Sequence, residues 1–311
     1  MKSYIKLIVI FFLFPFMGCE DYLNRYPLNN PSDATFLSNE TELKMAVAGC
    51  YSTLWYNFEG MPFHLCLDAA SDIGWERNGS NLQAIGRGAQ DSRNGLVVDF
   101  WTNMYSGIAK CNYVLTNMER CKNSVSEAVY KQNESEVRFL RALFYSYLSE
   151  LYGGVPLVTK PLTLSEAQIP RNTKEEVVSF ILTELNQCAE YLPQQNKPTS
   201  GKATKGAAWS LASRVALYNE RWDVATSSAQ KVMSLEGTEY NLNSNYMDLF
   251  QYAGQSSKEI IFSVQYLKVA SVHPLFRLLA SRNALGGNTN KVPSYQLSDS
   301  WECIDGKQID E

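Results

Sequence analysis

Residues 134–161 read ESEVRFLRALFYSYLSELYGGVPLVTKP, and this stretch decides the fold. Its apolar residues recur at three- and four-residue steps, which is the spacing of one helical face, and further apolar side chains widen that face beyond a single stripe. The pattern predicts a helix that is buried on more than one side. Gly153 and Gly154 can close its last turn in the left-handed conformation, and Pro156 keeps Val155 out of helical backbone space. An extended segment over residues 155–158 should follow the helix.

The composition is that of a folded protein with a large core. The 311 residues are 45% hydrophobic and 12% aromatic, which excludes a disordered or low-complexity chain. The formal net charge is -4, so the charge balance does not favour a nucleic acid as partner.

The N-terminus has the pattern of a bacterial lipoprotein. Lys2 and Lys6 give a basic start, the apolar run over residues 7–16 is too short to span a bilayer, and Cys19 follows Gly18 in the lipobox-like sequence FMGC. We expect residues 1–18 to be a signal peptide and Cys19 to be the lipid-modified mature N-terminus, because several acyl chains anchor a protein firmly. The alternative is an ordinary signal peptide with a chance cysteine. Residues 19–38 should form an extended tether.

Other segments with helical periodicity are residues 41–58, 99–120, 173–192, 205–219 and 222–235. Thr173, with Glu176 three residues later, gives a capping-box signal at the start of one of them. Small residues such as Ala208 and Ala225 make the last two segments resemble a tetratricopeptide unit. Because each helix pair needs a neighbour to cover its open face, this pair and the preceding one within 141–191 predict a short superhelical stack, over about residues 99–237.

Residues 59–98 break the helical pattern, because glycines punctuate a polar stretch with scattered apolar residues. We expect a long irregular loop, and such loops in compact domains are usually functional or disordered. Sugar recognition needs an aromatic face for the apolar side of a pyranose and planar polar groups for its hydroxyls. The loop supplies both in six candidate ligand residues: Asp72, Trp75, Arg77, Asn78, Asn81 and Gln83. The alternative is that Trp75 only anchors the loop to the core.

Signatures of enzymes and of metal or cofactor sites are missing from the sequence, which has no G-x-S-x-G, H-E-x-x-H or Walker pattern. The 2 histidines have no partner at metal-ligand spacing. Asp68 and Asp72 could in principle drive glycoside hydrolysis, although no positional pattern supports this alternative. Arg138 and Arg141 are expected to bind neighbouring carboxylates or carbonyls. We therefore predict a binding protein without catalytic residues, metal or cofactor.

The cysteines after Cys19 have no C-x-x-C spacing, and several lie in apolar helical patterns. Their expected role is that of small buried hydrophobic residues. Disulfides stay open as an alternative, because spacing does not reveal pairing. The six residues are Cys50, Cys66, Cys111, Cys121, Cys188 and Cys303.

The pattern E-x-R-x-L-R-A-x-x-Y-x-x-L-x-x-x-Y-G-G-V-P-L-V, from Glu136 to Val158, closely resembles the central signature of the SusD-like (RagB/SusD) family. Three other parts of the chain are similar to elements of the family: the segment after Cys19, the strand-like EIIFSVQ within residues 258–266, and residues 293–306. The resemblance implies a mostly α fold, a SusD-like superhelix built on tetratricopeptide-type helix pairs with long irregular loops and a few short strands. It implies one such domain over residues 39–311.

The family's members are lipoproteins on the outside of the Gram-negative outer membrane. The resemblance implies that palmitate and other acyl chains on Cys19 hold this chain at the cell surface. There it would capture an oligosaccharide and deliver it to a SusC-like TonB-dependent transporter, with peptide cargo as an alternative. The rival of a different class is a helical-repeat scaffold that binds a protein partner. An exposed aromatic platform in residues 59–98 would favour the sugar; a buried Trp75 and a bare apolar groove along the helices would favour the scaffold.

The last residues predict that the chain is incomplete. Asp305-Gly306 is a turn signal followed by the opening of another segment, and SusD-like proteins continue well beyond this point. Segments after about Gly237, including the strand-like residues 260–266, are then expected to lack partners and to pack poorly. Glycan binding by the 311-residue form should be weak or absent, and limited proteolysis should leave a fragment that ends near Gly237.

Overall fold

The computed structural model describes residues 36–58, 61–194, 200–266 and 279–301. The predicted signal peptide, Cys19 and most of the tether lie outside these residues, as does Cys303. The described chain is mostly helical, and none of its helices is long and apolar enough to cross a membrane. The main helices are α3 (Glu40–Tyr51), α6 (Gly95–Asn117), α7 (Glu127–Tyr152), α8 (Lys174–Cys188), α9 (Lys205–Tyr218) and α10 (Trp222–Met233).

Shorter elements connect or flank these helices. The short α-helices are α4 (Phe63–Ala69), α5 (Asn81–Gly86), α12 (Arg282–Leu285) and α13 (Tyr295–Asp299). The 3-10 helices are η2 (Ser52–Trp55), η3 (Met118–Ser124), η4 (Leu164–Glu166), η6 (Tyr246–Phe250) and η7 (Tyr252–Ser256). Within the described ranges, the strands form two antiparallel pairs, β1 (Asn57–Phe58) with β2 (Met61–Pro62) and β3 (Gly74–Glu76) with β4 (Lys291–Pro293).

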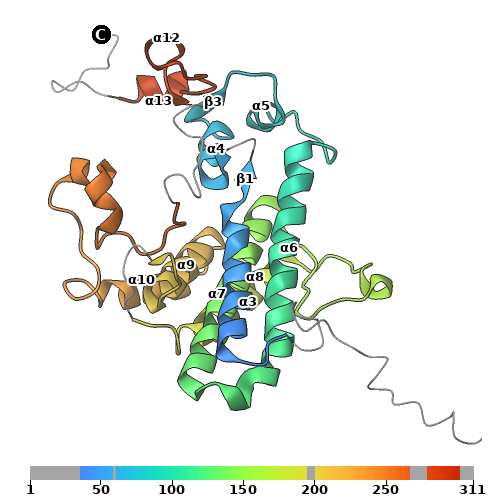
Figure 1. Cartoon of the computed structure of the whole chain (residues 1–311). Helices are drawn as coiled ribbons and strands as arrows, with labels where there is room; N and C mark the ends of the chain where they lie inside the picture. The colour runs from blue at the N-terminus through green and yellow to red at the C-terminus, as the bar shows by residue number, and fades with distance from the viewer. Residues whose placement is uncertain (1–35, 59–60, 195–199, 267–278, 302–311) are drawn as a thin grey trace, which may run out of the picture.

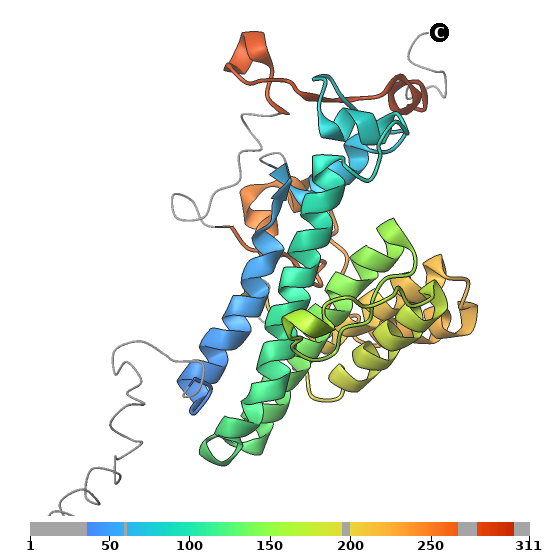
Figure 2. The same cartoon turned by 90° about the vertical axis from the view of Figure 1, so that its right-hand side faces the viewer.

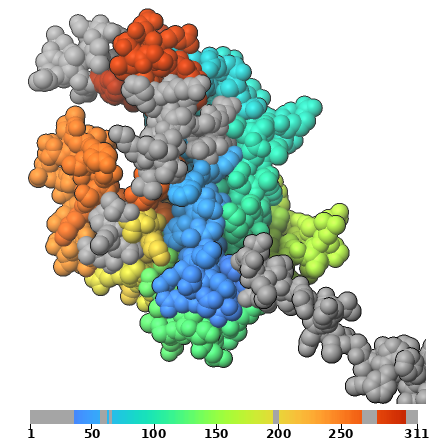
Figure 3. Space-filling model, viewed as in Figure 1, coloured from blue at the N-terminus to red at the C-terminus, as the bar shows by residue number. Residues whose placement is uncertain are grey.

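Consecutive long helices pack against each other in chain order, α6 on α7, α7 on α8, α8 on α9 and α9 on α10. Helix α3 lies along α6 and α7, as Figure 1 shows, and Figure 2 shows α8 to α10 displaced to one side of this group. This arrangement confirms the predicted superhelical stack. In Figure 3 the segment that contains η6 and η7 (orange) projects from one side of the helical body.

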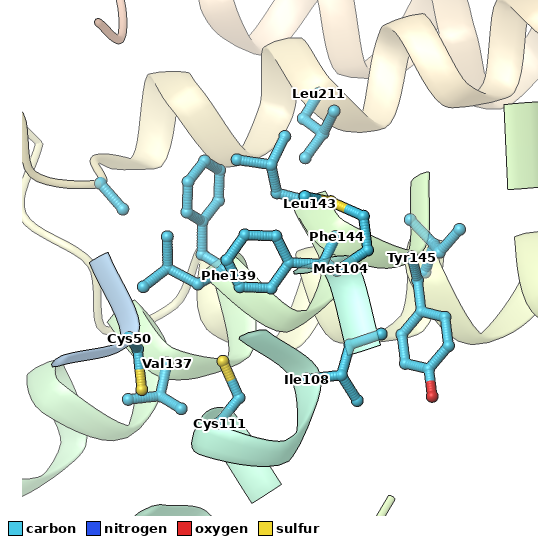
Figure 4. Packing of buried hydrophobic residues seen from close by; sticks show 14 of the residues in the cluster. Cys50, Met104, Ile108, Cys111, Val137, Phe139, Leu143, Phe144, Tyr145 and Leu211 are labelled. Carbon is cyan, nitrogen blue, oxygen red and sulfur yellow. The ribbon is translucent and has the colours of Figure 1, made fainter. Parts of the chain in front are cut away.

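Helix α7 is the centre of the core, as predicted. It begins after Ser126, whose side chain accepts a hydrogen bond from the Val129 main-chain N–H, and it ends at Gly153, which has a φ of 72°. Its buried side chains include Phe139, Phe144 and Tyr145, which meet residues of α6 and α9 in Figure 4. The helix is therefore covered by neighbours on several sides, which explains its unusually apolar sequence.

The extended segment after α7 is held by side chains of α6 and α7. The Tyr145 hydroxyl accepts a hydrogen bond from the Val158 main-chain N–H at 2.7 Å and donates to the Val158 oxygen at 3.0 Å. Asn112 Nδ2 also donates to the Val158 oxygen, at 2.8 Å. Burial raises the pKa of Tyr145 to about 12, so its hydroxyl keeps its proton. These bonds satisfy backbone groups that have no strand partner.

A buried ionic cluster joins α7 to α8. Arg141 donates to Glu184 Oε2 from Nη2 at 2.6 Å and from Nε at 3.0 Å, and Arg138 Nη1 donates to Glu184 Oε1 at 2.7 Å. Arg141 Nη1 also donates to Asn112 Oδ1 at 2.8 Å, which ties in α6. The prediction that both arginines bind neighbouring carboxylates is confirmed. The cluster fixes three helices in register because the planar guanidinium geometry is specific.

Two sequence expectations about irregular regions are wrong. Residues 59–98 are not simply a long loop, because they contain α4, β3, α5 and the first turn of α6, which starts at Gly95 rather than at Asp99. Residues 260–266 do not form a strand. They still pack on the core, where the Phe262 ring lies 5.2 Å from the Phe139 ring in an edge-on contact. Local β propensity was overridden because this segment is held by side-chain packing rather than by a neighbouring strand.

The cysteines within the described residues are buried: Cys50, Cys66, Cys111, Cys121 and Cys188. This confirms the expectation that they act as small buried hydrophobic residues. Trp101 on α6 and Trp209 on α9 are only partly buried, and both pack against the core cluster.

Candidate functional site

The predicted ligand residues lie in a small lobe at one end of the helical body (Figure 1). We define the lobe as α4, β3, α5, β4, α12 and α13. Strand β3 pairs with β4 in the register Gly74 with Pro293, Trp75 with Val292 and Glu76 with Lys291. A Cβ at Gly74 would lie 2.5 Å from the Asp68 oxygen, so only glycine lets β3 approach α4 this closely.

A buried ion pair holds the two strands of the lobe together. Glu76 Oε2 lies 2.6 Å from Lys291 Nζ, and the side chains are 1% and 9% exposed. The other carboxylate oxygen of Glu76 accepts a hydrogen bond from the Asn78 main-chain N–H at 3.1 Å. Because side chains alternate across a strand, Glu76 points inward and Trp75 lies on the opposite face of β3.

Trp75 is half-buried and is covered by a cation. The Arg87 guanidinium carbon lies 5.1 Å from the centroid of the Trp75 ring. Arg87 itself is exposed, so it can move without disturbing the core. Trp75 is therefore neither a fully buried anchor nor a bare platform, and the two sequence interpretations each describe part of its environment.

Three of the other candidates keep exposed side chains near Trp75. Asp72 and Asn78 are exposed, and the Asp72 main-chain oxygen accepts a hydrogen bond from Ser294 Oγ. Arg77 is exposed and its Nη1 donates to the Thr289 oxygen at 3.3 Å. A carboxylate, a guanidinium and an amide thus lie within about three residues of Trp75 along the chain, and their side chains are exposed.

The two candidates on α5 have roles in the lobe itself. Gln83 Nε2 donates to the Glu76 main-chain oxygen at 2.9 Å and so fixes α5 on β3. The Asn81 main-chain oxygen accepts a hydrogen bond from Asn94 Nδ2 at 3.0 Å, while the Asn81 side chain is exposed. Gln83 therefore uses its side chain inside the lobe, whereas the Asn81 side chain stays exposed.

A cavity of about 420 Å³ is lined by residues of the lobe, the start of α6 and the end of α7. Its walls are mainly apolar and include the rings of Phe63 and Phe100, which stack with centroids 4.2 Å apart. Gln90, Asp91 and Ser92 supply polar groups to its lining. Hydrogen bonds from the Arg93 side chain and main chain hold the pKa of Asp91 below its usual range.

A larger groove of about 720 Å³ lies between α7, α9 and residues 259–266. Its lining is again mainly apolar, with Arg214 from α9 and Glu259 as charged members. Burial raises the pKa of Tyr147, which also lines it, to about 12. Asp68 and Asp72, the carboxylates of the hydrolase alternative, line neither this groove nor the cavity.

Sequence reasoning missed Arg87 and Lys291 as members of the site. Lys291-Val292-Pro293 is too short for a periodic strand signal, and proline in it argues against a central strand. Arg87 lies between two glycines in a polar stretch, and nothing local links it to Trp75. Only the folded lobe brings these residues together.

Comparison with known proteins identifies the family. Residues 21–217 match the SusD-like model described as "Starch-binding associating with outer membrane", which is more than half of the chain. The chain belongs to the SusD-like family. The mostly helical architecture agrees with this assignment, because a SusD-like carbohydrate binding protein from Bacteroides fragilis matches 88% of this chain with a TM-score of 0.80 and 26% identity.

Among relatives by sequence, SusD-like protein P25 of Formosa agariphila is 25% identical over 86% of this chain and 53% of its own length. The starch-binding protein SusD of Bacteroides thetaiotaomicron is 24% identical over 83% of this chain and 45% of its own length. The match with the B. fragilis structure covers 55% of that chain. This SusD-like chain therefore spans about half the length of the relatives that it matches.

Proposed function

We propose that this SusD-like chain binds an oligosaccharide at the surface of the lobe, around Trp75. The observation that carries the proposal is the half-exposed Trp75 ring on β3, with the exposed side chains of Asp72, Arg77 and Asn78 on the same short segment. Support also comes from the names of the relatives, which are a starch-binding protein and a carbohydrate binding protein.

The chemistry of these side chains fits a sugar. The apolar face of a pyranose stacks on an aromatic ring, and its hydroxyls pair with carboxylate, amide and guanidinium groups. The Arg87 side chain, which covers Trp75, would move aside or donate to a hydroxyl of the bound sugar. The buried Glu76–Lys291 pair keeps β3 in place while its outer face stays open to the ligand.

The place of this binding in nutrient uptake is part of the same proposal. Cys19 would carry the lipid that anchors the chain in the outer membrane, with the lobe on the exterior. A SusC-like TonB-dependent transporter would receive the oligosaccharide. The lipobox-like sequence before Cys19 and the outer-membrane description of the family support this part.

The test is a binding comparison with a matched tryptophan control. Binding of soluble starch and laminarin oligosaccharides is measured by isothermal titration for the unaltered chain, Trp75→Ala and Trp222→Ala. Trp222, on α10, is 59% exposed and lies outside the lobe. Loss of a stacking ring should weaken binding about tenfold in Trp75→Ala with little change in melting temperature. Equal affinity in all three proteins, or a large fall in the melting temperature of Trp75→Ala alone, would contradict the proposal.

A second candidate function is supported by the groove between α7 and α9. Its mainly apolar lining of about 720 Å³ matches the expectation for a helical-repeat scaffold that binds a protein partner. Ser210→Trp would fill this groove with an aromatic side chain. If the scaffold function holds, this variant should lose association with its partner on the outer membrane, whereas Trp75→Ala should keep it.

A further inference from the structure

Two buried thiols meet where α3 packs against α6. Cys50 on α3 and Cys111 on α6 are each 0% exposed, and both are free. The Cys50 side chain acts directly on the Cys111 thiol and raises its pKa, so the two thiols are neighbours in the core. Figure 4 shows the two sulfur atoms in one part of the core, beside Val137 of α7.

The two helical segments also pack tightly at the next contact, where Gly107 leaves room for a side chain. A Cβ added to Gly107 of α6 would lie 2.8 Å from the Thr53 methyl group, in η2 directly after α3. Lys110 Nζ donates to Thr53 Oγ1 at 3.2 Å. Thr53 is one helical turn from Cys50, and Gly107 is one turn from Cys111, so these contacts lie on the same faces. A disulfide requires a Cα separation of about 4.4–6.8 Å, and a glycine in the contact between two helices lets them pack closely enough for such a separation.

We infer that Cys50 and Cys111 form an intramolecular disulfide when the protein folds in an oxidising compartment. One thiolate attacks the disulfide of an oxidant, which is a protein or small-molecule disulfide, and gives a mixed disulfide with release of one oxidant thiol. The second thiolate then displaces the other oxidant thiol. The two cysteines lose two protons and two electrons, and the oxidant disulfide is reduced to two thiols.

The exchange has to occur while the core is still open. Burial raises the pKa of the Cys111 thiol well above its ordinary value, and the neighbouring Cys50 side chain raises it further. A thiol reacts as its thiolate, so the folded core protects this pair from both oxidation and reduction. The bond would therefore be made during folding and would persist afterwards.

The bond would close a loop that holds α4, β3 and α5. Residues 50 and 111 lie in the segments that lead into and out of this half of the lobe, so the bond would fix its base. The inference rests on the export part of the proposed function, because structural disulfides persist in oxidising compartments and are rare in the cytosol.

The other buried cysteines provide internal controls. Cys121 Sγ donates to the Met118 oxygen at 3.0 Å, and Cys188 Sγ donates to the Leu185 oxygen at 3.3 Å, each within its own helical segment. Each of these thiols already donates a hydrogen bond to a main-chain carbonyl three residues earlier in the chain. They should stay reduced under the same conditions.

The experiment maps the bond by mass spectrometry. The full chain with Cys19→Ser and Cys66→Ser is refolded with oxidised and reduced glutathione, alkylated without reductant and digested with trypsin. Cleavage after Lys44, Arg77, Lys110 and Arg120 gives residues 45–77 and 111–120, each then with one cysteine. We expect these two peptides to be linked, and their link to vanish in Cys111→Ser. Protein that is unfolded and refolded in a reductant lacks the bond. Its melting temperature should be about 10 °C lower than that of the oxidised protein.

Alkylated Cys50 and Cys111 in a chain with native circular dichroism would overturn the inference. So would links of Cys121 or Cys188 at the same frequency, because they would indicate random oxidation. Oligosaccharide titration on the same oxidised sample separates the two proposals, since the linked peptides can form whether or not a glycan binds. The same mapping on protein taken from outer membranes, alkylated at harvest, tests whether the bond forms during export; free thiols there would contradict it.

Discussion

The helical stack and the lobe are stabilised by different kinds of contacts. In the stack, neighbours along the chain pack on each other, and the Glu184 carboxylate binds both Arg138 and Arg141 at the centre of three helices. In the lobe, two short strands more than 200 residues apart are joined through Glu76 and Lys291. The stack therefore has many cooperating contacts, whereas the lobe depends on a few long-range ones. Function-bearing segments often have this lower local stability.

The largest effect is expected from Glu184→Ala in the stack. The change leaves two arginines near the core without their shared carboxylate, and the loss of one partner of a buried pair costs about 3–5 kcal/mol. Urea unfolding followed by circular dichroism should show a clear fall in the midpoint. Lys44→Ala is the control, because Lys44 and Glu40 form an exposed pair at 2.6 Å whose loss should cost less than about 1 kcal/mol. Equal effects of the two changes would show that the buried cluster does not stabilise the stack.

Lys291→Met should open the lobe and leave the stack intact. It leaves Glu76 buried without its cation, and the lobe can relax, so we expect a cost of about 2–3 kcal/mol that is confined to this region. Hydrogen exchange should speed up in residues 74–76 and 291–293 and stay unchanged in α7 and α8. The double change Glu76→Gln with Lys291→Met removes both charges and should restore part of the protection. Faster exchange throughout α7 would instead make the lobe and the stack one cooperative unit.

The sequence predicted the stack well because its signals are local. The apolar spacing in residues 134–152 and the Thr173–Glu176 capping box each act within a few residues, and the structure confirms both. Gly153 does end the helix with a positive φ of 72°, but its ψ of -127° differs from the left-handed helical conformation that was predicted. Arg138 and Arg141 could also be interpreted correctly, since charged groups inside an apolar helix need partners. Their shared partner, Glu184, could not be named from sequence.

The lobe could be predicted only in part, because its contacts are long-range. The candidate residues around Trp75 fall in one small region, but the strand β4 that pairs with them and the Arg87 side chain over the ring have no local signal. The expectation that every segment after Gly237 lacks a partner was wrong for the same reason. Residues 291–293 pair with β3, and Trp55 Nε1 donates to the Gln265 main-chain oxygen at 3.1 Å.

The smallest effect is expected in the exposed turn around η4, which belongs to neither region and is held by local contacts alone. Glu166 accepts hydrogen bonds from Lys160 Nζ at 2.8 Å, from the Thr163 main-chain N–H at 3.0 Å and from Thr163 Oγ1 at 2.9 Å. The side-chain hydrogen bond from Lys160 is the largest cause that lowers the pKa of Glu166 to about 2, with the bonds from Thr163 next.

Because this pKa is lower in the folded chain than the ordinary value of 4.5, the turn is stabilised above about pH 4.5 and loses that contribution as the pH falls toward 2. Lys160→Ala removes the first cause and keeps the Thr163 bonds. The pKa of Glu166, followed by carboxyl carbon NMR, should then rise toward its ordinary value while the urea midpoint at pH 7 stays within error, since exposed pairs contribute little. An unchanged titration of Glu166 would mean that the Thr163 bonds alone lower its pKa. A lower urea midpoint would mean that this turn, despite its exposure, is coupled to the stack.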